Sequence, residues 1–175
     1  MPGSLQAWYS LRDVAALADR EVELSGETEV AKLSRLSPLV HAAAHGRLVA
    51  ARLCFGRTPV GTIRLELSLQ ATVGLVCQRC LEIVEYELDE TIGWSLTETQ
   101  SGHGSAGEGL DELVLERGRF RPIDLLEDEL IVSLPMVPRH ASIDECGALA
   151  QNLNLVREDQ GGELTGRTLE VYLGE

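Results

Sequence analysis

The feature that most constrains the fold is an alternation of apolar and other side chains between Ile63 and Leu75. Seven apolar residues occupy every second position of this stretch. An extended strand directs successive side chains to opposite faces of a sheet. The pattern therefore predicts a strand with one buried face.

Two neighbouring stretches extend this prediction. Residues 48–55 form a shorter apolar run, and residues 84–96 again place apolar residues at every second position except Glu90. Short connections between consecutive strands of this kind are typical of antiparallel pairing. We therefore expect a three-stranded antiparallel meander.

Helical spacing predicts three helices around these strands. The first covers residues 10–19 and carries a capping box of Ser10 and Asp13, and a short strand at residues 21–26 follows it. The second covers residues 30–40, near the end of which stands Pro38. The third covers residues 123–135 and presents an apolar stripe, with Asp124 and Glu127 in a capping-box arrangement. This helix should lay its apolar side on the sheet and display Glu127, Asp128 and Glu129.

These elements together predict an α+β fold, in which an antiparallel meander of long strands is packed by a few short helices. We expect residues 1–175 to form one domain. Its parts are a helix and strand opening at 1–45, the strands at 46–99, a flexible loop at 100–112, and a helix with an irregular Cys/His-containing segment at 113–175. The loop is rich in glycine around His103, and the terminal stretch 167–173 has a strand pattern.

The net charge of the chain restricts the kind of partner that it can bind. The formal net charge is -13, and residues 82–131 hold 14 acids against three arginines. Attraction to a phosphate backbone requires clustered lysine and arginine, so broad binding to nucleic acid is not expected. No apolar run approaches the roughly 18 residues of a membrane span, and the opening residues lack a secretory signal. We expect a cytoplasmic protein that does not bind membranes.

Cys77 and Cys80 form a C-x-x-C pair at the predicted turn between the second and third strands of the meander. In a reducing cytosol such a pair binds a metal or takes part in redox chemistry. Redox pairs of the thioredoxin type lie at a helix N-terminus in a βαβ unit, which this context lacks. Zinc is therefore the candidate cofactor.

A tetrahedral zinc site needs two further ligands, and His140 and Cys146 are the candidates. The alternative for this second pair is that Cys146 is a small buried residue and His140 caps a loop. Cys54 lies inside an apolar strand and is expected in the core. No hydrolase, phosphate-binding or dinucleotide-binding motif is present, so neither catalysis nor a small-molecule substrate is expected.

The order of these motifs resembles the YceD family, the large ribosomal RNA subunit accumulation proteins of bacteria and plastids. The resemblance rests on the alternating strand that leads into Cys77-Gln-Arg-Cys80, on the segment Ile123-Asp-Leu-Leu-Glu-Asp-Glu-Leu-Ile-Val-Ser-Leu-Pro135, and on Met136-Val-Pro-Arg-His140 with Cys146. Many relatives carry further cysteines where this chain reads Gly147-Ala-Leu-Ala-Gln, so a second metal cluster is not expected.

The resemblance implies a non-catalytic factor for the synthesis, processing or stability of 23S ribosomal RNA and for assembly of the large ribosomal subunit. The expected partners are a large-subunit precursor, a ribosomal protein or an RNA-processing factor. The candidate contact residues are Arg79, Asp124, Glu127, Asp128 and Glu129. The alternative function is a dithiol redox or metal-dependent enzyme that uses Cys77 and Cys80.

Overall fold

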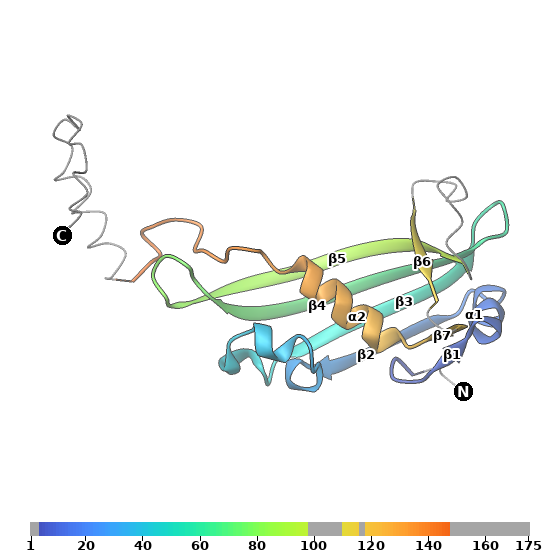
Figure 1. Ribbon diagram of the computed structural model, residues 1–175, viewed down its shortest axis with the longest axis horizontal. Coiled ribbons are helices and arrows are strands. Elements are labelled where there is room, and N and C mark those ends of the chain that lie inside the picture. The colour runs from blue at the N-terminus through green and yellow to red at the C-terminus, as the bar shows by residue number, and fades with distance from the viewer. Residues whose placement is uncertain (1–3, 98–109, 116–117, 148–175) are drawn as a thin grey trace, which may run out of the picture.

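The computed structural model describes residues 4–97, 110–115 and 118–147 (Figure 1). Within these ranges the chain forms two sheets, two α-helices and three short 3-10 turns. Their bounds, in chain order, are β1 Tyr9–Ser10, α1 Leu11–Ala18, β2 Glu23–Glu29, η1 Val30–Lys32, η2 Ser37–Leu39, η3 Ala42–Ala44, β3 Leu48–Arg57, β4 Ile63–Val76, β5 Ile83–Thr97, β6 Asp111–Val114, β7 Arg119–Phe120 and α2 Pro122–Ser133.

The main sheet has the strand order β2-β3-β4-β5-β6. The first four strands are antiparallel, and β6 joins β5 in parallel. The predicted alternation of β4 is confirmed, because its odd-numbered residues from Ile63 to Leu75 are all buried. The α+β class and the antiparallel meander of long strands are therefore as the sequence predicts.

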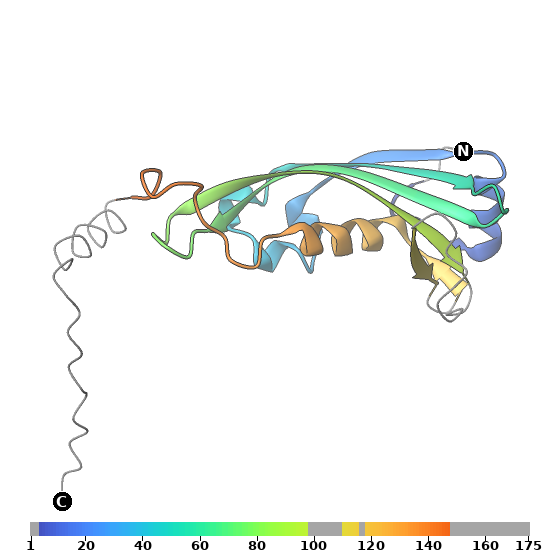
Figure 2. The same cartoon turned by 90° about the horizontal axis from the view of Figure 1, so that it is seen from above.

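The helix α2 lies in the concave side of the arched sheet (Figure 2). Leu126 and Leu130 on its inner side are at most 1% exposed. The predicted capping box of Asp124 and Glu127 is wrong, because the helix begins at Pro122 after Arg121 and has no side-chain cap. Pro122 suits the first helical position, where a missing N–H costs no hydrogen bond. Asp124 then falls in the first turn, where its carboxylate binds Arg121.

The first predicted helix is confirmed with its cap. Ser10 precedes α1, its hydroxyl accepts a hydrogen bond from Asp13 N at 3.2 Å, and the Asp13 carboxylate accepts one from Ser10 N at 2.8 Å. This reciprocal capping satisfies two backbone donors at the start of the helix. Val14 and Ala18 face the core.

The predicted helix at residues 30–40 is wrong. The chain forms the turns η1 and η2 there, and the N–H groups of Arg35 and Leu36 donate to the Glu127 carboxylate instead of to helical carbonyls. Pro38 also lacks the N–H that a continuous helix would need. Four apolar residues of this stretch are nevertheless buried in the core, namely Val30, Leu33, Leu36 and Val40, whereas Leu39 is exposed.

Cys54 is half-buried on the outer face of β3 and so is not a core residue, because the buried face belongs to its neighbours Leu53 and Phe55. The expected loop at 100–112 ends earlier, since β6 begins at Asp111. His103 and the predicted strand at 167–173 lie outside the described residues. Neither α1 nor α2 has the length and apolar character required to cross a bilayer.

Candidate metal centre

The turn between β4 and β5 carries Cys77 and Cys80. Cys77 N donates to Glu82 O at 2.8 Å, and Leu81 N donates to Cys77 O at 2.9 Å. Leu81 adopts a left-handed backbone with a φ of 64°, which completes the reversal between the strands. Such a conformation is uncommon for a residue with a side chain, so the surrounding hydrogen bonds must hold it. The result is a tight knuckle that turns both thiols toward the interior.

Residues 134–147 bring the second pair of candidates to this turn. Gln78 N donates to Pro138 O at 2.8 Å. The Tyr86 hydroxyl donates to Arg139 O at 2.9 Å and accepts from Arg139 N at 2.8 Å. These contacts anchor the segment to β5 and to the knuckle at the two residues that precede His140.

Arg79 ties the two segments together from inside the knuckle. Its Nε donates to Cys146 Sγ at 2.9 Å, and its terminal nitrogen donates to His140 O at 3.2 Å and also to Ser142 O. A planar guanidinium can make these bonds at once because its donors point in fixed directions. Arg79 therefore orients two of the four candidate ligands.

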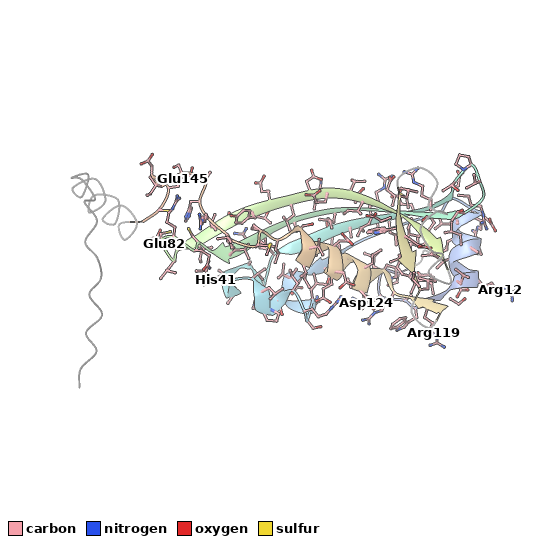
Figure 3. All side chains as sticks on the ribbon, turned by 45° about the horizontal axis from the view of Figure 1, so that its top comes forward. Arg12, His41, Glu82, Arg119, Asp124 and Glu145 are labelled. Carbon is pink, nitrogen blue, oxygen red and sulfur yellow. The ribbon has the colours of Figure 1, made fainter. Side chains whose placement is uncertain are left out.

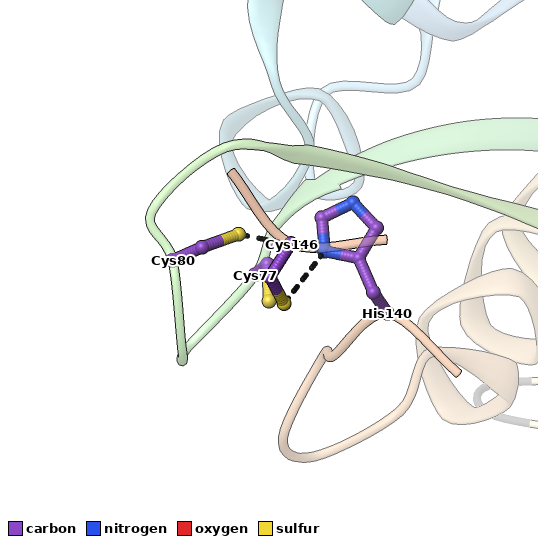
Figure 4. Close-up of side chains that lie close together, drawn as sticks. All are labelled: Cys77, Cys80, His140 and Cys146. Carbon is purple, nitrogen blue, oxygen red and sulfur yellow. Dashed lines mark hydrogen bonds between the residues drawn. The ribbon is translucent and has the colours of Figure 1, made fainter. Parts of the chain in front are cut away.

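Cys77, Cys80, His140 and Cys146, hereafter the Cys/His cluster, converge at this end of the sheet (Figure 4). One ligand atom from each residue lies within 4.8 Å of all the others. His140 Nδ1 is 3.5 Å from Cys80 Sγ and 3.6 Å from Cys146 Sγ. The three thiols are buried and His140 is half-buried.

The two separations between His140 Nδ1 and the sulfurs of Cys80 and Cys146 fit a tetrahedral ion. With Zn–S bonds of about 2.3 Å and a Zn–N bond of about 2.0 Å, neighbouring ligand atoms stand roughly 3.5–3.8 Å apart. Three soft thiolates and one imidazole also form a donor set that zinc prefers. Four protein ligands would fill the coordination shell, which is the pattern of structural rather than catalytic zinc.

Electrostatics also favours a thiolate at the cluster. Burial acts to raise the pKa of Cys77, but hydrogen bonds from the backbone N–H groups of Cys80, Arg79 and His140 outweigh it and lower that pKa to about 5. Burial raises the pKa of Cys146, and the hydrogen bond from Arg79 acts against that rise. Metals bind the deprotonated form, so Cys77 is ready to coordinate at neutral pH.

The predicted contact acids lie on α2, away from the cluster. Figure 3 places Glu82 and Glu145 at the end that carries the cluster, and Asp124 farther along the molecule. Glu127 is only 5% exposed, so the expectation that α2 displays it is wrong. Asp128 is exposed and pairs with Arg35, and Glu129 is half-buried. Their assignment as contact residues stays a prediction.

Sequence reasoning missed Tyr86, which positions the segment that carries His140, and Arg35, which holds α2. In the sequence Tyr86 is only an apolar member of a strand, although its hydroxyl holds Arg139. Arg35 belongs to the stretch mistaken for a helix and pairs with Glu127 and Asp128. No spacing rule signals either contact, because each joins segments more than 50 residues apart.

Comparisons with known proteins agree with the motif order. A family model described as "Large ribosomal RNA subunit accumulation protein YceD" matches residues 65–163, a range that contains the whole cluster. The curated YceD protein of Haemophilus influenzae is 33% identical over 104 residues. That alignment covers 57% of this chain and 57% of the relative, little more than half of either. No solved structure matches the chain.

Proposed function

Because the chain belongs to the YceD family, we propose that it is a non-catalytic factor for the synthesis, processing or stability of 23S ribosomal RNA, and thereby for assembly of the large ribosomal subunit. The observation that carries this proposal is the family match over residues 65–163. Its place of action would be the cytoplasm, and its partners a large-subunit precursor, a ribosomal protein or an RNA-processing factor.

The Cys/His cluster is proposed to bind one zinc ion as a structural clamp. Such an ion would join the knuckle at Cys77 and Cys80 to the segment that carries His140 and Cys146. A zinc held by four protein ligands contributes to folding and leaves no position for a substrate. This role agrees with a factor that presents a surface rather than one that performs a reaction.

The apolar core supports treating the chain as one domain. Buried residues from Leu5 near the start to Cys146 belong to a single hydrophobic cluster. Contiguous packing of this kind is the usual mark of one domain. We therefore propose that residues 1–175 form one domain.

The function is tested in cells that lack the gene. We expect the ratio of large-subunit to small-subunit ribosomal RNA to fall, and the wild-type gene to restore it. An unchanged ratio, with normal sedimentation of large-subunit particles, would contradict the proposed function.

The zinc clamp is tested by metal analysis of the purified protein. We expect about one zinc per chain in the wild type and a loss of most of it in Cys77→Ser and in His140→Ala. Cys54→Ser is the matched control, since Cys54 lies outside the cluster, and it should keep the metal. Wild-type protein without zinc after expression in zinc-supplemented medium would refute the clamp.

A dithiol redox enzyme is the second candidate, and the low pKa of Cys77 favours it. A thiolate at neutral pH is the attacking group in thiol–disulfide exchange. Disulfide reductase activity that Cys77→Ser abolishes would support this candidate. Thiols that are protected by bound zinc and lack such activity would rule it out.

A further inference from the structure

One border of the main sheet is open over much of its length. β5 runs from Ile83 to Thr97, but β6 pairs with it only from Trp94 to Thr97. Residues 83–93, hereafter the β5 edge, pair with β4 on one side and with no described strand on the other (Figure 1). An edge strand directs alternate N–H and C=O groups away from its sheet. The β5 edge can therefore accept one more strand.

The side chains of this edge have one sign of charge. It contains Glu85, Glu87, Asp89 and Glu90, all exposed, and no lysine or arginine. Arg47 pairs with Glu85. Glu87 and Glu90 have no basic partner in the part of the chain that the structure describes. The edge is thus strongly acidic as well as open.

The two faces of the edge differ, which defines what an added strand should look like. Glu85, Glu87 and Asp89 lie on the outer face of the sheet, whereas Leu88, the exposed Glu90 and the half-buried Ile92 lie on the concave face, where the core is. A neighbouring strand places its own alternate side chains on the same two faces. Basic residues on the outer face would complement the three acids there, and mainly apolar residues with one basic residue opposite Glu90 would complement the concave face.

We propose that the β5 edge binds an extended basic segment of a partner protein, which joins the sheet as an additional strand. Backbone hydrogen bonds would supply the docking, and the acids would select lysine and arginine at alternate positions. A second copy of this chain is a poorer occupant, because pairing two such edges would bring acids together. An RNA strand would meet repulsion from the same acids.

This inference deepens the proposed function, on which it rests for its setting. A protein that contacts ribosomal RNA needs clustered lysine and arginine for that contact, and such proteins are among the partners proposed above. An acidic edge that accepts an extended basic segment would recognise them directly. The site on the edge is distinct from the Cys/His cluster.

The test is titration of the full purified chain with a peptide of roughly nine residues that alternates lysine and valine. We expect saturable binding that weakens as salt rises. Glu87→Lys with Asp89→Lys should weaken it at least about tenfold. Glu23→Lys with Glu27→Lys on β2, two exposed acids at the opposite border of the sheet, is the matched control and should change it less than about twofold.

Two N-methylated peptides separate strand addition from simple charge attraction. One carries methyl groups on the odd amides and the other on the even amides, so only one of them blocks the N–H groups that face the edge. We expect that peptide to lose binding and the other to retain it. Amide exchange should also slow within residues 83–93 when the unmodified peptide binds.

Four outcomes would overturn the inference. They are no binding up to about millimolar peptide, equal binding of both N-methylated peptides, an equal loss with the double variant on β2, and preferential binding of a single-stranded RNA oligonucleotide. None of these results depends on ribosomal RNA levels in cells, so failure of the β5 edge to bind is distinguishable from failure of the proposed function.

Discussion

At the residue scale, Glu127 has the most consequential contacts outside the cluster. Its carboxylate accepts hydrogen bonds from Arg35 N at 2.6 Å and Leu36 N at 3.1 Å, and it pairs with Arg35 Nε at 3.2 Å. These bonds link α2 to the stretch between the turns η1 and η2. The acid that the sequence suggested as a surface contact is thus a partner for backbone donors.

We expect Glu127→Ala to destabilise the protein by about 2–4 kcal/mol, because it leaves two backbone donors without an acceptor in a buried position. The measurement is unfolding in chemical denaturant. Glu127→Gln should cost less, since its amide oxygen can still accept a hydrogen bond. A loss below about 0.5 kcal/mol for Glu127→Ala would be typical of a surface substitution and would contradict this role.

Glu129 lies two residues farther along α2, near other acidic groups. Burial first, and then the nearby charges of Asp128 and Asp111, raise the pKa of its carboxyl group above the ordinary value. A raised pKa means that the folded state holds the proton more tightly than the unfolded state. The stability it contributes is complete below the unfolded pKa and is lost as pH rises through the folded pKa.

Glu129→Gln removes that loss, because glutamine stays neutral at every pH. We therefore expect the variant to have a higher melting temperature than the wild type at pH 7 and a similar one below about pH 4. Thermal unfolding followed across this pH range gives the comparison. A difference that does not change with pH would show that the effect arises from packing rather than from charge.

At the scale of elements, prediction from sequence succeeded where a local pattern and the packing agree. The alternation in β4 specifies its buried face, and the Ser10 and Asp13 box specifies the start of α1. It failed at residues 30–40, where hydrogen bonds to Glu127, some 90 residues away, replace those of a helix. No local sequence pattern indicates the parallel pairing of β6 with β5 either. Short connections between consecutive strands indicate only antiparallel hairpins.

The link between β5 and residues 134–147 depends on one hydroxyl. Tyr86 both donates to Arg139 O and accepts from Arg139 N. We expect Tyr86→Phe to leave the sheet folded and to cost about 1 kcal/mol in unfolding experiments. Amide exchange should accelerate in residues 136–142 and remain unchanged in β3. Faster exchange throughout the sheet would contradict a local role for this contact.

At the scale of the whole molecule, the site could be predicted only in part. The C-x-x-C pair is visible because its spacing is local, and His140 with Cys146 could be proposed as completing it. The position of Arg79 between the two segments could not, because it depends on how residues 134–147 return to the knuckle. The open border of β5 likewise emerges only once the strand order is known.

Removal of the proposed zinc should loosen the end of the molecule that carries the cluster and leave the interior of the sheet unchanged. The cluster lies at the β4–β5 turn, whereas the interior of β4 is packed by residues such as Leu65 and Leu69, both at most 1% exposed. Three close thiols without an ion would no longer hold the knuckle to the returning segment. We therefore expect a chelator to accelerate amide exchange in residues 77–82 and 138–146 and to leave residues 63–73 protected. Re-addition of zinc should reverse the change, and Cys54→Ser should behave as the wild type. Global unfolding on chelation would mean that the ion supports the entire fold, and unchanged exchange at the knuckle would mean that it clamps nothing.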